Sequence, residues 1–178
     1  MDGGGNVYTV GFGGWRNQCG IDHVFGGEAG ARFYGVEGLD IFANYAVNYD
    51  LDEVPGDCIE APDTVTRDQK TSRHKVNVGT QLRTEFGLEG EITFHYQTSQ
   101  LWGEQVATLE GIELQTFELP DYHLLNGRIG FAFLEERNAV VAVTVFNALA
   151  DVFGEPPQQH PFGNRIGRRF MGFFSYRL

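Results

Sequence analysis

The stretch that decides the fold class is Leu39-Asp40-Ile41-Phe42-Ala43-Asn44-Tyr45-Ala46-Val47-Asn48-Tyr49-Asp50-Leu51. Its odd-numbered positions are all apolar or aromatic, and most of its even-numbered positions are polar. Successive side chains of a β-strand point to opposite faces, so this alternation predicts a strand with one apolar and one polar face. Strands of globular proteins usually have about five or six residues. The longer alternation here is sufficient for a tilted bilayer crossing, which needs roughly 9–11 residues.

The same alternation recurs further along the chain. Residues 75–86 place Val76, Val78 and Leu82 on one parity, and residues 91–99 place Ile92 and Phe94 on one parity. Five further strands are expected at residues 7–15, 21–34, 122–134, 139–151 and 165–178. Valine and alanine occupy both parities of residues 139–151, so the faces of that strand stay unassigned. The sequence therefore predicts about eight long strands.

The expected connections between these strands alternate in length. Tight turns are predicted at residues 35–38, 87–90 and 135–138, and longer loops at residues 52–72, 103–121 and 152–164. Short turns on one side and long loops on the other are typical of outer-membrane barrels, whose turns are periplasmic and whose loops are extracellular. The predicted fold is all-β, an antiparallel transmembrane β-barrel segment of meandering strands. A soluble β-sandwich or lipocalin-like barrel is the alternative, and it would turn the apolar parity toward a core.

Composition and charge exclude several function classes. The formal net charge is -11, which argues against binding the nucleic-acid backbone. The chain has no run of 18 apolar residues, so no transmembrane helix is predicted. The first ten residues, MDGGGNVYTV, have neither the basic start nor the apolar centre of a signal peptide. Because an outer-membrane protein must be exported, we expect the chain to be part of a longer protein.

Several segments carry a family resemblance in their order and spacing. Residues 122–130, YHLLNGRIG, resemble the antepenultimate strand of TonB-dependent receptors, and residues 145–151, VFNALAD, resemble their "N-L-x-D" penultimate strand. Residues 168–178, RRFMGFFSYRL, resemble their closing strand. Upstream, Gly26-Gly27-Glu28, the run 36–39 and Asn44-Tyr45-Ala46 are similar to the family's "G-x-E … G-L … A-N-Y" hairpin. From about residue 20 to residue 178, the chain resembles the C-terminal part of such a receptor barrel, without its plug domain.

The resemblance implies a role and a set of partners. The implied role is TonB-dependent uptake of a small-molecule ligand, such as a ferric siderophore, across the bacterial outer membrane. The implied partners are membrane lipid and lipopolysaccharide, the remainder of the barrel with its plug, and the TonB energy-coupling system. The closing strand places four residues on one parity, which resembles the signal read by the barrel-assembly machinery: Phe170, Phe174, Tyr176 and Leu178. No cofactor is implied.

Individual residues suggest binding rather than catalysis. Arg83, His95 and Arg128 lie on the polar parity and are the candidate ligand-binding residues facing a barrel lumen. Arginine suits an anionic ligand, although pairing with carboxylates of the lumen or plug is the alternative. The histidines and cysteines have no metal-ligand spacing, and the sequence contains no nucleophile–base arrangement, so no metal site and no enzyme activity are predicted.

Other residues are expected near the ends of the strands. Cys19 and Cys58 fall in predicted extracellular loops, where a disulfide is one possibility. Trp15 and Trp102 fit either an interfacial aromatic girdle or ligand stacking. A basic group near the outer end of the last strand either contacts lipopolysaccharide or is simply exposed: Arg165, Arg168 and Arg169.

Two rival functions remain open at this point. One is a stand-alone eight-stranded outer-membrane barrel with a structural or adhesive role. The other is a soluble β-barrel that binds a ligand, which predicts that Leu39, Ile41 and Tyr45 point into a core.

Overall fold

The computed structural model describes residues 21–53, 71–109, 111–134, 137–150, 152 and 156–177. In this part of the chain the secondary structure consists of nine β-strands. No helix among the described residues is long and apolar enough to cross a membrane. The all-β prediction is confirmed.

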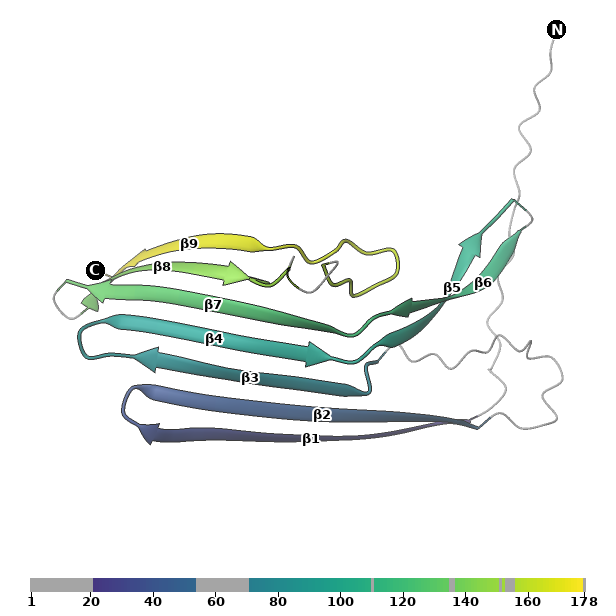
Figure 1. Ribbon diagram of the computed structural model, residues 1–178, viewed down its shortest axis with the longest axis horizontal. Helices are drawn as coiled ribbons and strands as arrows, with labels where there is room; N and C mark the ends of the chain where they lie inside the picture. The colour runs from purple at the N-terminus through teal and green to yellow at the C-terminus, as the bar shows by residue number, and fades with distance from the viewer. Residues whose placement is uncertain are drawn as a thin grey trace, which may run out of the picture.

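Seven strands form one antiparallel sheet in the order β1-β2-β3-β4-β7-β8-β9 (Figure 1). Their bounds are β1 Ile21–Val36, β2 Leu39–Glu53, β3 His74–Arg83, β4 Leu88–Gln97, β7 Tyr122–Phe133, β8 Ala139–Phe146 and β9 Arg169–Tyr176. The short turns lie at one end of the sheet, together with the C-terminus (Figure 1). Among the described strands β1 and β9 are the two edges and do not pair with each other, so this sheet is not closed into a barrel.

The remaining two strands, β5 (Gln100–Ala107) and β6 (Ile112–Leu119), pair only with each other. Their hairpin projects beyond the end of the sheet that lies opposite the short turns (Figure 1). The prediction of a long loop at residues 103–121 is therefore wrong. Gly111 has a positive φ of 145°, and the Thr108 amide donates to the Gly111 carbonyl over 2.7 Å. This turn closes a strand pair in a stretch whose glycine and acidic residues suggested a loop.

The register between strands places the apolar parities on one side of the sheet. Tyr45 of β2 lies opposite Val76 of β3, which lies opposite Tyr96 of β4. Directly opposed residues of neighbouring strands point to the same face, so this face continues across the whole sheet. We call it the apolar face. Its members include Phe33, Ile41, Ala43, Val78, Leu82, Ile92, Phe94, Leu125, Ile129, Phe131, Val141, Val143, Phe170, Phe174 and Tyr176.

Register also assigns the faces that the sequence left open in β8. Val141 lies opposite Phe131 on one side and Phe174 on the other, so it belongs to the apolar face. Val140 and Ala142 belong to the opposite side, which we call the polar face. Three of the four closing-strand residues, Phe170, Phe174 and Tyr176, thus share a face as expected.

The apolar face is largely exposed. Ile129 and Phe174 are 61% and 67% exposed, and Val78 and Leu82 are 41% and 38% exposed. Ile41 and Tyr45, which a soluble barrel would turn inward, are also exposed. The buried apolar side chains of the described residues are few and mostly small: Leu119, Tyr122, Ala132, Ala139, Ala142 and Ala150. Contiguous exposed apolar surface of this extent marks a face that another apolar phase or partner covers.

Several strand ends differ from the prediction. β8 stops at Phe146 rather than at residue 151, because Asn147 adopts a left-handed conformation with φ 50° and a turn follows. β3 stops at Arg83 rather than at residue 86. Thr84 begins a turn, and the Thr84 hydroxyl accepts from the Leu88 amide over 2.9 Å. β9 begins at Arg169 rather than at residue 165.

Each short turn is hydrogen-bonded to the next strand of the sheet or to the residue directly after it. The Gly38 carbonyl accepts from the Arg83 amide over 2.7 Å, and the Gly87 carbonyl accepts from the Ala132 amide over 2.8 Å. The Asn138 carbonyl accepts from the Arg177 amide over 2.8 Å in the same way. Gly38 and Gly87 have positive φ values of 75° and 98°, which glycine adopts at little cost.

Some predictions lie outside the described residues. These are the strand at residues 7–15 with Trp15, the cysteines Cys19 and Cys58, most of the loop at residues 52–72, and Leu178.

Candidate functional site

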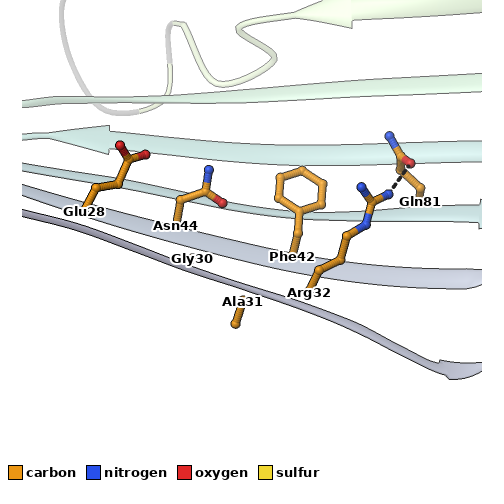
Figure 2. Close-up of a pocket in the computed structure, with 7 residues that line it drawn as sticks. All are labelled: Glu28, Gly30, Ala31, Arg32, Phe42, Asn44 and Gln81. Carbon is orange, nitrogen blue, oxygen red and sulfur yellow. Dashed lines mark hydrogen bonds between the residues drawn. The ribbon is translucent and has the colours of Figure 1, made fainter.

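The polar face of β1–β4 and β7 carries the candidate site. The alternation that places apolar residues on one side of each strand places amides and charged groups on the other. Figure 2 shows Glu28, Arg32, Asn44 and Gln81 projecting to the same side of the first three strands. They line an open depression of about 720 Å³ together with Gly30, Ala31 and Phe42. A depression with this lining is suited to a hydrated polar molecule rather than to an apolar one.

A chain of polar contacts crosses four strands at this depression. Arg32 Nη2 lies 3.0 Å from Asp40 Oδ2 and 3.3 Å from Gln81 Oε1. Gln81 Nε2 in turn donates to Glu91 Oε2 over 3.3 Å. Arg32 is 45% exposed at its side chain, so the ion pair with Asp40 contributes little to stability. The ion pair instead holds the Arg32 guanidinium in place above the sheet.

The ring of Phe42 fills the space above a glycine of the neighbouring strand. A Cβ at Gly79 would lie 2.4 Å from Cζ of Phe42 and 3.0 Å from the Ile92 carbonyl oxygen, so a larger residue there would displace this ring. The arrangement presents one aromatic surface among the amides and charges of the depression (Figure 2).

The predicted ligand-binding residues lie on this face but do not form one cluster. Arg128 Nη1 pairs with Glu89 Oε2 at 3.0 Å, with both side chains 30% exposed. Arg83 lies opposite Glu89 in the register, so the two arginines flank the same carboxylate. Arg128 thus pairs with a carboxylate, which was the alternative to its binding a ligand.

His95 lies further along β4, away from the arginines. Its Nδ1 is 2.6 Å from Asn77 Oδ1, and its ring centroid is 6.0 Å from that of Tyr122. A group of three or more His, Cys, Asp or Glu side chains placed to hold a metal ion is absent from the described residues. His95 is therefore a hydrogen-bonded member of the polar face.

A second cluster joins the β5–β6 hairpin to the segment that precedes β9. The ring of Trp102 meets the ring of His160 edge-on at 4.7 Å, and Phe117 meets Phe162 edge-on at 5.2 Å. Trp102 Nε1 also donates to Gln100 Oε1 over 3.1 Å. Trp102 thus links the projecting hairpin to the segment before β9.

Buried amides connect this hairpin and the segment before β9 to the sheet, and sequence analysis missed them. Gln100 Nε2 donates to the buried hydroxyl of Ser72 over 2.9 Å. Asn147 directly follows β8 and is 1% exposed; its side-chain nitrogen donates to the Ile166 carbonyl, and its backbone amide donates to Asn126 Oδ1 over 2.9 Å. The only sequence signal was Asn147 itself, an amide in a run of valine and alanine.

The basic residues before and at the start of β9 are all exposed. Arg168 Nε donates to the Ala148 carbonyl over 3.1 Å, and the Arg169 guanidinium lies 5.8 Å from the centre of the Phe146 ring. Arg165 is exposed as well, which fits both alternatives, contact with lipopolysaccharide and simple surface exposure.

Comparison with known proteins adds no family: no protein-family model and no curated protein sequence matches the chain.

Proposed function

We propose that the chain forms part of the wall of a transmembrane β-barrel in the bacterial outer membrane. The apolar face meets lipid, and the polar face borders a water-filled interior. The observation that carries the proposal is the exposed apolar face that continues in register across all seven strands of the sheet. Lipid is the environment that removes the cost of such a surface, while the opposite face keeps its charges and amides in water.

The dimensions of the apolar face support a bilayer crossing. On β7 this face runs from His123 to Phe133, ten residues apart. At about 3.3 Å per residue and a strand tilt of about 40°, the band is roughly 25 Å tall. This height equals the lipid-facing band of outer-membrane barrels, about 25 Å.

Strand direction constrains how such a barrel closes. Every neighbouring pair in the sheet is antiparallel, so β1 and β9, the first and last of seven, run in the same direction. Direct closure would create a parallel pair, and a second copy inserted in the same orientation would do the same. Closure with antiparallel pairs therefore needs an odd number of further strands between β9 and β1.

We further propose that these strands belong to a TonB-dependent receptor, with this chain as the C-terminal part of its barrel. The motif order described above supports this assignment, as does the polar depression, which offers charged and amide groups to a ligand such as a ferric siderophore. The role is receptor and transporter rather than enzyme. The rival is a stand-alone barrel of eight strands, which needs only one further strand. Genomic sequence upstream of Met1 separates the two, because the receptor requires a plug domain and more strands there.

Tryptophan scanning of two adjacent positions tests the lipid contact. Val78 and Asn77 are neighbours in β3 on opposite faces, so Val78→Trp and Asn77→Trp form a matched pair. The background carries Trp15→Phe and Trp102→Phe, with the β-sheet content checked by circular dichroism. The chain is reconstituted in phosphatidylcholine vesicles whose acyl chains are brominated.

The proposal predicts that brominated chains quench the tryptophan at position 78 and that aqueous iodide quenches the one at position 77. Equal access of both quenchers to the two positions would remove the membrane assignment. Lipid quenching at position 77 alone would reverse the two faces.

A further inference from the structure

The apolar face changes character at the end opposite the short turns. From Leu82 back to Val76, β3 presents aliphatic side chains and a single threonine to this face, and then His74 follows. The same change occurs on the two strands beside it, at Tyr45 of β2 and Tyr96 of β4. In a membrane barrel, tyrosine gathers at the level of the lipid headgroups. If the proposed function holds, this boundary lies at the outer headgroup layer.

Four residues form a compact group at this boundary, which we call the Arg73 cluster: Tyr45, Tyr49, Arg73 and His74. The Tyr45 hydroxyl lies 2.7 Å from His74 Nδ1, and the two rings stack with their centres 6.0 Å apart. Tyr49 meets His74 edge-on at 6.4 Å. The guanidinium of Arg73 lies 4.9 Å from the centre of the Tyr49 ring.

The backbone fixes the position of the Arg73 cluster. The Asn48 amide donates to the Arg73 carbonyl over 2.8 Å, and the His74 amide donates to the Thr98 hydroxyl over 3.1 Å. Arg73 itself is exposed, and Tyr45 and Tyr49 are both 43% exposed. A cation on an aromatic ring is thus held at the edge of an apolar surface.

Arg73 differs from the paired arginines of the polar face. Arg32 and Arg128 each bind a carboxylate, whereas Arg73 makes no ion pair with any side chain that the structure describes. Its guanidinium offers several N–H donors in a fork that suits phosphate oxygens. When the Tyr45 hydroxyl donates to Nδ1 of His74, the imidazole proton is on Nε2, which adds a further donor.

We propose that the Arg73 cluster binds the phosphate of an anionic lipid headgroup. The inference rests on the proposed function for the level at which the headgroup lies. The positive charge of Arg73 complements the phosphate, and the tyrosine rings contact the adjoining acyl and glycerol portions. The apolar face below the cluster accommodates the acyl chains of the same lipid.

Lipid binding to the full chain in a mild detergent tests the site. Native mass spectrometry measures the dissociation constants of phosphatidic acid and phosphatidylcholine for the wild type, Arg73→Ala and Arg73→Lys. Lys75→Ala is the matched control, because Lys75 is a nearby cation on the polar face of β3, whereas Arg73 precedes the strand and contacts Tyr49 on the apolar face. A parallel titration adds inorganic phosphate as competitor.

We expect phosphatidic acid to bind the wild type more tightly than phosphatidylcholine. Arg73→Ala should weaken phosphatidic acid binding about fivefold, the factor that corresponds to one cation beside an anionic lipid. Arg73→Lys should retain most of the affinity, and Lys75→Ala should equal the wild type. Inorganic phosphate should displace little lipid; full displacement would identify free phosphate as the ligand and overturn the lipid assignment.

Two outcomes would refute the site: an Arg73→Ala affinity equal to that of the wild type, or an equal loss in Lys75→Ala. Failure of the proposed function is separable, because it is read from the quenching of tryptophan at position 78 in vesicles. A chain that fails that test but retains the Arg73-dependent preference binds the headgroup without spanning the bilayer.

Discussion

Replacing Gly38 with alanine should separate the β1–β2 hairpin from β3. A Cβ at this position would lie 2.1 Å from the Arg83 carbonyl oxygen, which is backbone and cannot rotate away. The positive φ of Gly38 adds about 1–2 kcal/mol for an L residue. Displacing the Arg83 strand also weakens the hydrogen bond from its amide to the Gly38 carbonyl, which contributes about 0.5–1.5 kcal/mol. The expected loss of unfolding free energy is about 2–3 kcal/mol.

Two other glycines separate these causes. Gly111 has a positive φ of 145° but no atom within 4 Å of an added Cβ, so Gly111→Ala reports the conformational cost alone, about 1–2 kcal/mol. Gly172 lies in β9 with open space around the added Cβ and no positive φ, so Gly172→Ala should be neutral or stabilise by about 0.5 kcal/mol.

Urea unfolding of the full chain in detergent micelles, followed by circular dichroism, measures all three variants. The comparison requires an unchanged denaturant slope, so that the midpoint reports stability. The order of losses should be Gly38→Ala, then Gly111→Ala, then Gly172→Ala. If Gly38→Ala loses no more than Gly111→Ala, the carbonyl contact does not hold the hairpin to β3.

Three further changes test other parts of the structure. Arg128→Ala should cost less than about 1 kcal/mol, because its pair with Glu89 is partly exposed and screened; urea midpoints at low and high salt measure it, and a loss independent of salt would argue against screening. Asn147→Gly keeps the left-handed backbone but removes the buried amide, so a loss of about 1–3 kcal/mol is expected in the same assay, and Asn147→Ala should lose more. Trp102→Ala removes the ring that contacts His160, so limited proteolysis should cut residues 156–168 faster; unchanged cleavage would show that other contacts anchor this segment.

Much of the sheet could be predicted from alternation because one face of each long strand is apolar. The faces of residues 39–51, 75–83 and 91–97 follow from parity alone, and the register between strands agrees with them. In β8 parity is uninformative, since valine and alanine satisfy either face. Its faces are set by its partners Phe131 and Phe174, which lie far away in the sequence.

The candidate site was predicted only at the level of the face. Parity placed Arg83, His95 and Arg128 on the polar side, but parity cannot say which of them share a neighbour. Glu89 pairs with Arg128 and lies opposite Arg83, and Asn77 bonds His95; each of these neighbours depends on the register between strands. The β5–β6 hairpin was missed because its residues alternate weakly and are stabilised by contacts with the segment around His160.

The β5–β6 hairpin interrupts the chain between β4 and β7, yet these two strands pair directly from Leu88 with Phe131 to Gln97 with Tyr122. The hairpin satisfies its own backbone ladder from Gln100 with Leu119 to Ala107 with Ile112. Residues added or removed in opposed pairs at its tip would leave the remaining ladder in place. The hairpin can therefore change in length at its tip while β4 and β7 keep their register.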